Sequence, residues 1–150
     1  MEQVKDNFKS NSNENRLTYR KMIISILYQF ELENLIVNSE VVNKKFKLNQ
    51  QEKETISFIE KRYTFFRASI IKFLEKKETT WRSTKPLIRA ILIFGTFELL
   101  YITKEIVINE FVELTKIYTL EEKENDYKFV NAILQKVSEL FETTEKKKTN

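Results

Sequence analysis

The sequence contains no cysteine and no histidine, and it has a single glycine and a single proline among its 150 residues. Without cysteine there is neither a disulfide nor a thiolate metal site, and without histidine the commonest metal ligand and general base are missing. A zinc site and a Ser-His or Cys-His catalytic pair are therefore excluded. One glycine and one proline are also too few for the many tight turns of a sheet protein.

The longest apolar stretch runs from Pro86 to Ile102 and contains only two charged residues, Arg89 and Glu98. Apolar side chains fall on every face of a 3.6-residue helix, which predicts a helix surrounded by other helices. The stretch is short for a bilayer span, and two internal charges argue against one. We therefore expect a single all-α domain with this segment as its central helix.

Helical periodicity marks most of the remaining chain. Asn49 and Glu52 have the spacing of a capping box at a helix start. Ser83 or Thr84 is expected to cap the central helix, and Gly95 within it indicates a close approach of another helix. The other expected helices run from Asn13–Arg16 to about Leu32, from Ser39 to Phe46, from Asn49 to the linker that begins at Lys76, from about Glu105 to Tyr118, and onward from Asn125 or Asp126.

The two ends of the chain are polar. Residues 1–14 are expected to be a disordered tail, residues 15–142 the helical domain, and residues 143–150 a frayed basic tail. The amino terminus has no apolar core, so it is not expected to be a signal peptide, and the expected compartment is the cytoplasm. Membrane-surface binding is not expected, because the apolar stripe of the first helix is needed for the core.

The net charge is only +4, but basic residues gather in particular segments. Residues 76–89 hold five basic residues and one acidic residue, and residues 1–21 hold five basic and three acidic residues. Such local clusters favour an anionic partner bound at one place. The alternative is that lysine-rich stretches simply lie on solvated faces.

Three sequence blocks together resemble a known family. The first is Arg16-x-x-x-Arg20-Lys21 followed by LYQFEL, the second is IRAILIFGTFELL, and the third is INEFVELTK followed by KFVNAIL. In this order and spacing, over roughly Arg16 to Val137, they resemble the NusB family of bacterial transcription antitermination factors.

The resemblance implies a compact bundle of about seven helices in two small subdomains, with no enzymatic activity and no cofactor. It also implies binding of the single-stranded boxA element in ribosomal RNA leader transcripts, together with the small-subunit ribosomal protein NusE. Some family members form homodimers.

The resemblance also implies which residues contact RNA. The family's basic amino-terminal segment corresponds to Arg16, Arg20 and Lys21, its "LYQ" tyrosine to Tyr28, and the opening of its "KFVN" helix to Lys128 and Phe129. Cationic side chains neutralise phosphates, and unpaired bases stack on aromatic rings, for which Tyr28, Tyr19 or Phe129 are candidates.

Two other functions remain open. A NusB-like protein-interaction scaffold with weak or lost RNA binding is suggested by Leu17, Thr18 and Tyr19, which replace further basic residues, and by Ile93, where many members carry arginine. NusB-like domains also occur at the front of rRNA cytosine methyltransferases. A fragment of such an enzyme would need a following domain with a Gly-rich cofactor loop, which these 150 residues do not contain.

Overall fold

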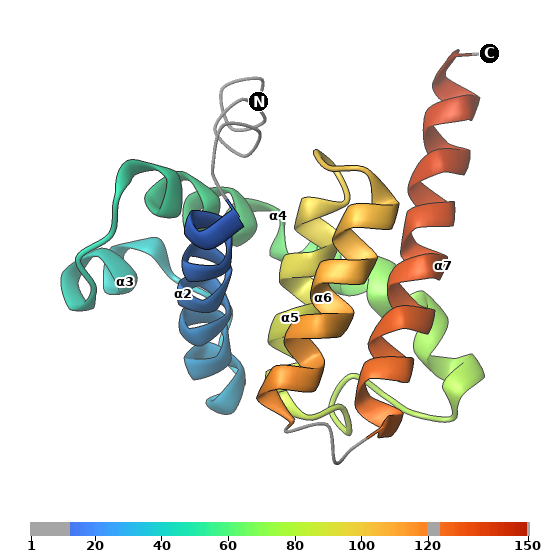
Figure 1. Ribbon diagram of the computed structural model, residues 1–150, viewed down its shortest axis with the longest axis horizontal. Coiled ribbons are helices and arrows are strands. Elements are labelled where there is room, and N and C mark those ends of the chain that lie inside the picture. The colour runs from blue at the N-terminus through green and yellow to red at the C-terminus, as the bar shows by residue number, and fades with distance from the viewer. Residues whose placement is uncertain (1–12, 120–123, 150) are drawn as a thin grey trace. The chain divides into compact units, whose positions relative to one another are not determined.

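The computed structural model describes residues 13–119 and 124–149, with side chains from 15 to 119 and from 125 to 144. This part of the chain forms six α-helices and one short 3-10 helix, and it contains no strand, so the all-α prediction is confirmed (Figure 1). The elements are α2 (Asn13–Leu32), α3 (Ser39–Lys45), α4 (Gln50–Leu74), η1 (Glu75–Lys77), α5 (Pro86–Glu98), α6 (Lys104–Tyr118) and α7 (Glu124–Thr149).

The chain divides into two compact units, which we call unit 1 (Met1–Thr64) and unit 2 (Phe65–Asn150). The boundary falls inside α4, so its first fifteen residues belong to unit 1 and the remainder to unit 2. Unit 1 holds α2, α3 and the first part of α4, and unit 2 holds the end of α4 together with η1, α5, α6 and α7.

Unit 1 combines an aliphatic core with buried hydrogen bonds. Ile23 and Leu27 of α2 and Ile59 of α4 are at most 1% exposed. The buried Tyr63 hydroxyl donates to the Glu31 carboxylate, and the Tyr19 hydroxyl lies 2.6 Å from Thr55 Oγ1. Because buried polar groups are costly unless they are paired, these bonds fix which side chains of α2 and α4 meet.

Side chains at the helix starts of unit 1 confirm one sequence prediction and add a second cap. Glu52 N donates to Asn49 Oδ1 at 2.8 Å while Asn49 N donates to the Glu52 carboxylate at 2.9 Å, which is the capping box predicted for α4. Asn38 caps α3 by accepting from Val41 N at 3.1 Å. The Ser39 amide and hydroxyl both donate to the Glu60 carboxylate, at 3.1 and 2.8 Å, which ties α3 to α4.

Three helices of unit 2, α5, α6 and α7, pack against one another. They run alternately up and down, side by side, in Figure 1. A Cβ at Gly95 of α5 would lie 3.0 Å from Leu134 of α7, so the close approach that this glycine predicted is present. Around it, ring contacts of 5.3–6.3 Å link successive aromatic side chains, namely Phe66, Phe94, Phe97, Tyr101 and Phe111.

The start of α5 differs from the sequence prediction. Its cap position is Lys85, which makes no capping side-chain bond, so neither Ser83 nor Thr84 caps the helix. Their hydroxyls are used within the preceding linker instead: Thr80 Oγ1 donates to Ser83 Oγ at 2.9 Å, and Thr84 Oγ1 donates to the Thr80 carbonyl at 2.7 Å. Pro86 at the first helical position needs no amide partner, which lowers the demand for a cap.

Two helix ends also differ. The central helix α5 ends at Glu98 rather than Ile102, because the amides of Leu100 and Tyr101 bond to carbonyls three residues back in tight turns. At the other end of the chain, α7 continues to Thr149, beyond the residue 143 at which a frayed tail was expected. The tail expected at residues 1–14 lies almost entirely outside the described residues. Within the described residues no helix is long and apolar enough to cross a membrane.

Candidate nucleic-acid interface

The outer face of α2 carries Lys21 and Tyr28, two of the residues that the sequence assigned to RNA. They are seven residues apart, which is nearly two helical turns, so they lie on one side of the helix about 10 Å apart along its axis. Lys21 is exposed and Tyr28 is half-buried. Leu17 and Leu32, at 38% and 53% exposure, extend the same face at either end. This face therefore presents a cation and an aromatic ring between two accessible apolar side chains.

Arg16 and Arg20 lie on a different side of α2. They are four residues apart, so they lie on one side of the helix. The residues three, four and seven positions after Arg20 lie on that same side, and these residues, Ile23, Ile24 and Leu27, are all buried. Arg20 is itself only 2% exposed, whereas Arg16 is half-buried. In this conformation the guanidinium of Arg20 is not presented to a strand in solution.

The rings proposed for base stacking are placed differently from one another. Tyr19 is 4% exposed and its hydroxyl is bonded to Thr55, so it is not available as a stacking surface. Tyr28 on α2 and Phe129 on α7 are each half-buried, which leaves part of each ring accessible. Of the three candidate rings, Tyr28 and Phe129 therefore remain accessible for base stacking.

The remaining predicted contacts, Lys128 and Phe129, lie in the first turns of α7 in unit 2. Lys128 is exposed. Phe129 lines a hollow of about 250 Å³ between the linker of residues 77–85 and the start of α7, and we call it the linker hollow. The predicted residues thus form two sets, one on α2 in unit 1 and one on α7 in unit 2.

The sequence prediction missed the residues of the linker hollow other than Phe129. Lys77 and Lys85 line it, and both come from the basic segment 76–89 whose charge was noted in the sequence but not assigned to the site. The signal that could have found them was this local charge, combined with the short linker that leads into a proline-started helix.

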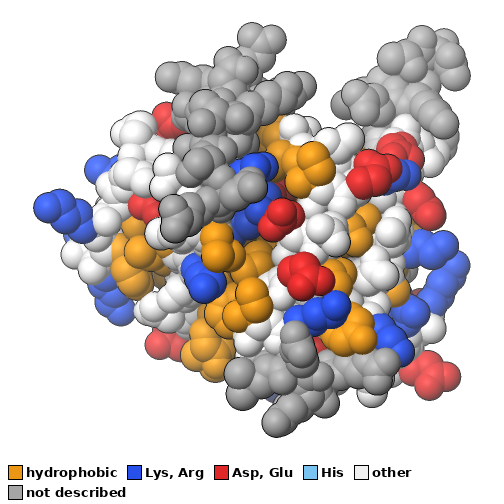
Figure 2. All heavy atoms as spheres, viewed as in Figure 1, with side chains coloured by type: hydrophobic (Ala, Val, Ile, Leu, Met, Phe, Trp, Pro, Cys, Tyr) orange, Lys and Arg blue, Asp and Glu red, His pale blue; other side chains and the backbone are white. Residues whose placement is uncertain are grey.

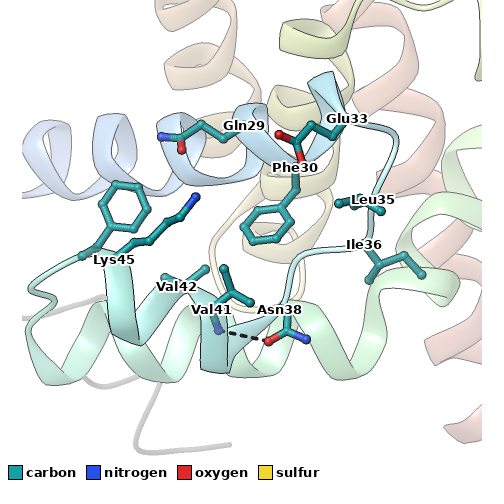
Figure 3. Close-up of a pocket in the computed structure, with 10 residues that line it drawn as sticks. Gln29, Phe30, Glu33, Leu35, Ile36, Asn38, Val41, Val42 and Lys45 are labelled. Atoms are coloured by element: carbon teal, nitrogen blue, oxygen red, sulfur yellow. Dashed lines mark hydrogen bonds between the residues drawn. The ribbon is translucent and has the colours of Figure 1, made fainter.

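Unit 1 contains a second hollow, of about 320 Å³, between the end of α2, residues 33–38 and α3. Figure 3 shows the Phe30 ring pointing from α2 toward Val41, with Leu35 and Ile36 on the adjoining loop. Leu35, Ile36 and Val41 are 40–51% exposed, so this hollow is mainly apolar and open to solvent. The turn that shapes it passes through Asn34 at φ 57, a left-handed conformation that asparagine tolerates.

Charge is mixed on the face of the molecule that Figure 2 shows, where basic, acidic and hydrophobic side chains are interspersed. Ile93, which stands where the resembled family often has arginine, is fully buried in α5 and offers no contact to a strand.

Comparisons with known proteins agree with the fold and with the sequence blocks. The sequence model of the NusB family matches residues 17–139. The transcription antitermination protein NusB of Methylacidiphilum infernorum (isolate V4) is 31% identical over 133 residues, which cover 81% of this chain and 89% of that protein. A crystal structure of T. maritima NusB matches with a TM-score of 0.67 at 25% identity, again over 81% of this chain and 89% of that one.

Proposed function

Since the chain belongs to the NusB family of transcription antitermination proteins, we propose that it binds a single-stranded boxA-type RNA of ribosomal RNA leader transcripts. It does so without catalysis and together with the small-subunit ribosomal protein NusE. Acting on such transcripts, it works in the cytoplasm.

The observation that carries this proposal is the outer face of α2. Lys21 supplies a phosphate contact and the accessible part of the Tyr28 ring supplies a stacking surface for an unpaired base. Lys128 and Phe129 supply the same pair of functions at the start of α7. A cation and a ring on the same helix face suit a flexible single strand, because phosphates and splayed bases alternate along it.

The two arginines have separate roles in this proposal. Arg16 remains a phosphate contact at the leading end of α2, where backbone N–H groups also favour an anion. Arg20, at 2% exposure, would have to leave its position to reach RNA. We therefore expect Arg20→Ala to lower the melting temperature of the protein and to change its RNA affinity little.

The direct test is binding of a labelled boxA-type strand and of a scrambled strand of equal length, each with and without the ribosomal protein. We expect tighter binding of the boxA-type strand, most clearly when the ribosomal protein is present. Equal affinity for both strands in both conditions would contradict the proposal. A salt series adds a count of phosphate contacts, since each contact to a single strand contributes about 0.7 to the slope of log K against log salt.

Variants locate the contact. Tyr28→Ala is expected to weaken binding about tenfold, the usual effect of losing one base-stacking ring. Lys21→Ala should lower the salt slope by about 0.7. Lys44→Ala on α3 is a matched control, because it removes an exposed lysine of the same unit and should change neither quantity.

A scaffold with weak or lost RNA binding is the second candidate. It is favoured by the burial of Arg20, which leaves one cation fewer for a strand, and by isoleucine at position 93, where the resembled family often has arginine. In that case the ribosomal protein would bind with unchanged affinity to wild type, Lys21→Ala and Tyr28→Ala, and no RNA preference would be measured.

A further inference from the structure

The hollow of unit 1 gathers exposed apolar side chains from two helices and the loop between them. Leu35 and Ile36 of the loop and Val41 of α3 line it, and all three are exposed. The half-buried Phe30 ring of α2 points toward Val41 in Figure 3. Apolar side chains that gather around a hollow on the protein surface mark a place where another molecule binds.

Hydrogen bonds hold the loop of this hollow at both ends. At its start the Leu35 amide donates to the Phe30 carbonyl at 2.9 Å, and at its end the amide and hydroxyl of Ser39 donate to the Glu60 carboxylate. Between these points Val37 is only 1% exposed, so it anchors the loop in the core of unit 1. The exposed apolar side chains are therefore presented on a fixed backbone, which lowers the entropy lost when a partner binds.

Cations lie at the α3 side of the hollow. Lys45 lines the hollow, and Lys47 follows directly after Phe46, which lines it as well. Both lysines are exposed, and in Figure 3 the Lys45 side chain extends toward the Phe30 ring. Among the described residues of the lining, only Glu33 is acidic. With two lysines against one glutamate, this side of the hollow favours a partner with negative charge.

We propose that the hollow of unit 1 binds an acidic amphipathic helix of a partner protein. The apolar row of this helix lies against Phe30, Leu35 and Ile36, and its acidic residues pair with Lys45 and Lys47. An open groove with apolar walls suits a helix, because side chains three and four positions apart point to one side of it. This interaction is separate from RNA binding, so it goes beyond the proposed function and does not depend on it.

The probe is a short acetylated and amidated peptide with leucines spaced three and four positions apart and glutamates beside them. Two related peptides are compared with it: one carries serines in place of the leucines, and the other carries lysines in place of the glutamates. Binding of each labelled peptide to the full chain is measured by fluorescence anisotropy for wild type, Ile36→Ser and Lys45→Glu.

Each variant has a matched control. Ile106→Ser replaces an isoleucine of α6 that is 44% exposed, against 45% for Ile36. Lys53→Glu reverses the charge of an exposed lysine on the part of α4 that belongs to unit 1, outside the lining of the hollow. Neither control should change the affinity for any of the three peptides.

The acidic peptide should bind wild type with a dissociation constant in the micromolar range, and the other two peptides at least about tenfold more weakly. Ile36→Ser should weaken binding of the acidic peptide about fivefold, because it removes apolar contact. Lys45→Glu should weaken it about tenfold, because a repulsion replaces an attraction. Lys45→Glu should also bind the lysine peptide more tightly than wild type does, a gain that an unfolded variant could not show.

Several results would overturn the proposal. They are the absence of micromolar binding, tighter binding of the serine or lysine peptide to wild type, and equal losses in the variants and their controls. A self-association in sedimentation velocity that Ile36→Ser abolishes would identify the occupant as a second copy of the chain and would also overturn it. The same holds if boxA-type RNA displaces the peptide, since the hollow would then belong to the RNA surface. Equal affinity of wild type for boxA-type and scrambled strands would, by contrast, contradict only the proposed function.

Discussion

The two units hold their helices together in different ways. In unit 1, buried hydroxyl and carboxylate groups join α2 to α4, through Tyr63 with Glu31 and Tyr19 with Thr55. In unit 2, rings pack on rings around Gly95, and Phe94, Phe97 and Phe111 are all fully buried. Hydrogen bonds select a partner by geometry, whereas ring packing depends on volume and shape. The stability of unit 2 should therefore fall most when a buried side chain is made smaller, and that of unit 1 when a buried hydrogen-bonding group is removed.

The two hollows differ less than the two cores do. The hollow of unit 1 has apolar side chains and one lysine, Lys45, and the linker hollow has the Phe129 ring and two lysines, Lys77 and Lys85. Each combines apolar surface with a cation, so the packing of the cores distinguishes the two units more clearly than the hollows do.

Removal of a central ring in unit 2 should have the largest effect. Phe97→Ala is expected to destabilise the protein by about 3–5 kcal/mol, because it leaves a cavity next to Phe66, Phe94 and Tyr101. The control is Phe65→Ala, the same substitution at a ring that is 45% exposed. The free energy of unfolding in urea measures both. A loss of less than about 1 kcal/mol for Phe97→Ala would contradict a core based on ring packing.

Loss of one buried hydroxyl in unit 1 should have the next largest effect. Tyr63→Phe keeps the ring and leaves the Glu31 carboxylate without that donor, so we expect a loss of about 1–3 kcal/mol. Tyr28→Phe, which removes a hydroxyl from a half-exposed ring, is the control and should be close to neutral. Amide hydrogen exchange shows where stability falls. Faster exchange confined to α5–α7 would contradict the assignment of this bond to unit 1.

Features set by local patterns were predictable from the sequence. The capping box at Asn49 and Glu52 and the close approach at Gly95 both follow from the residue type at a given place in a helix. The linker conformation was not predictable, because Thr80, Ser83 and Thr84 satisfy one another while Arg89 binds the linker carbonyls. Ser and Thr side chains can cap a helix or bond to their own loop, and the sequence alone does not decide between the two.

The candidate site was likewise only partly predictable from the sequence. Lys21 and Tyr28 leave part of their side chains accessible, because neither lies on the stripe that faces the core. Arg20 and Tyr19 are buried because their positions continue that stripe, and Arg20 was assigned to RNA through the family resemblance rather than through this pattern. The linker hollow could not be derived, because it joins residues about forty positions apart, such as Lys85 and Asp126.

The capping box offers a smaller and strictly local effect. Asn49→Ala removes the acceptor for the Glu52 amide and is expected to cost about 1 kcal/mol. Asn43→Ala, inside α3, is a matched control that should be neutral or slightly stabilising, because alanine has the higher helix propensity. The free energy of unfolding in urea is measured for both variants and compared with that of wild type. Equal effects would show that the Asn49 side chain adds nothing beyond helix propensity.

The smallest expected effect is a loss of stability in alkali that arises in unit 2. Burial raises the pKa of Tyr118 above its ordinary 10.0, and the hydrogen bond and charge of Glu142 raise the pKa of Lys104 above 10.5. When the pKa of a group is higher in the folded protein than in the unfolded chain, the unfolded chain releases that proton first as the pH rises. The contribution of the group to the free energy of unfolding is therefore complete below about pH 10 and is lost above it. Lys104 is exposed to solvent, so Tyr118 should make the larger contribution.

With no histidine in the chain, stability should change little between pH 6 and 9 and then fall as the pH rises past 10. Tyr118→Phe removes the tyrosine contribution and should flatten the decline relative to wild type. The measurement is the urea midpoint at pH 9 and at pH 11. If the midpoint of Tyr118→Phe falls as much as that of wild type, the decline comes from groups other than Tyr118.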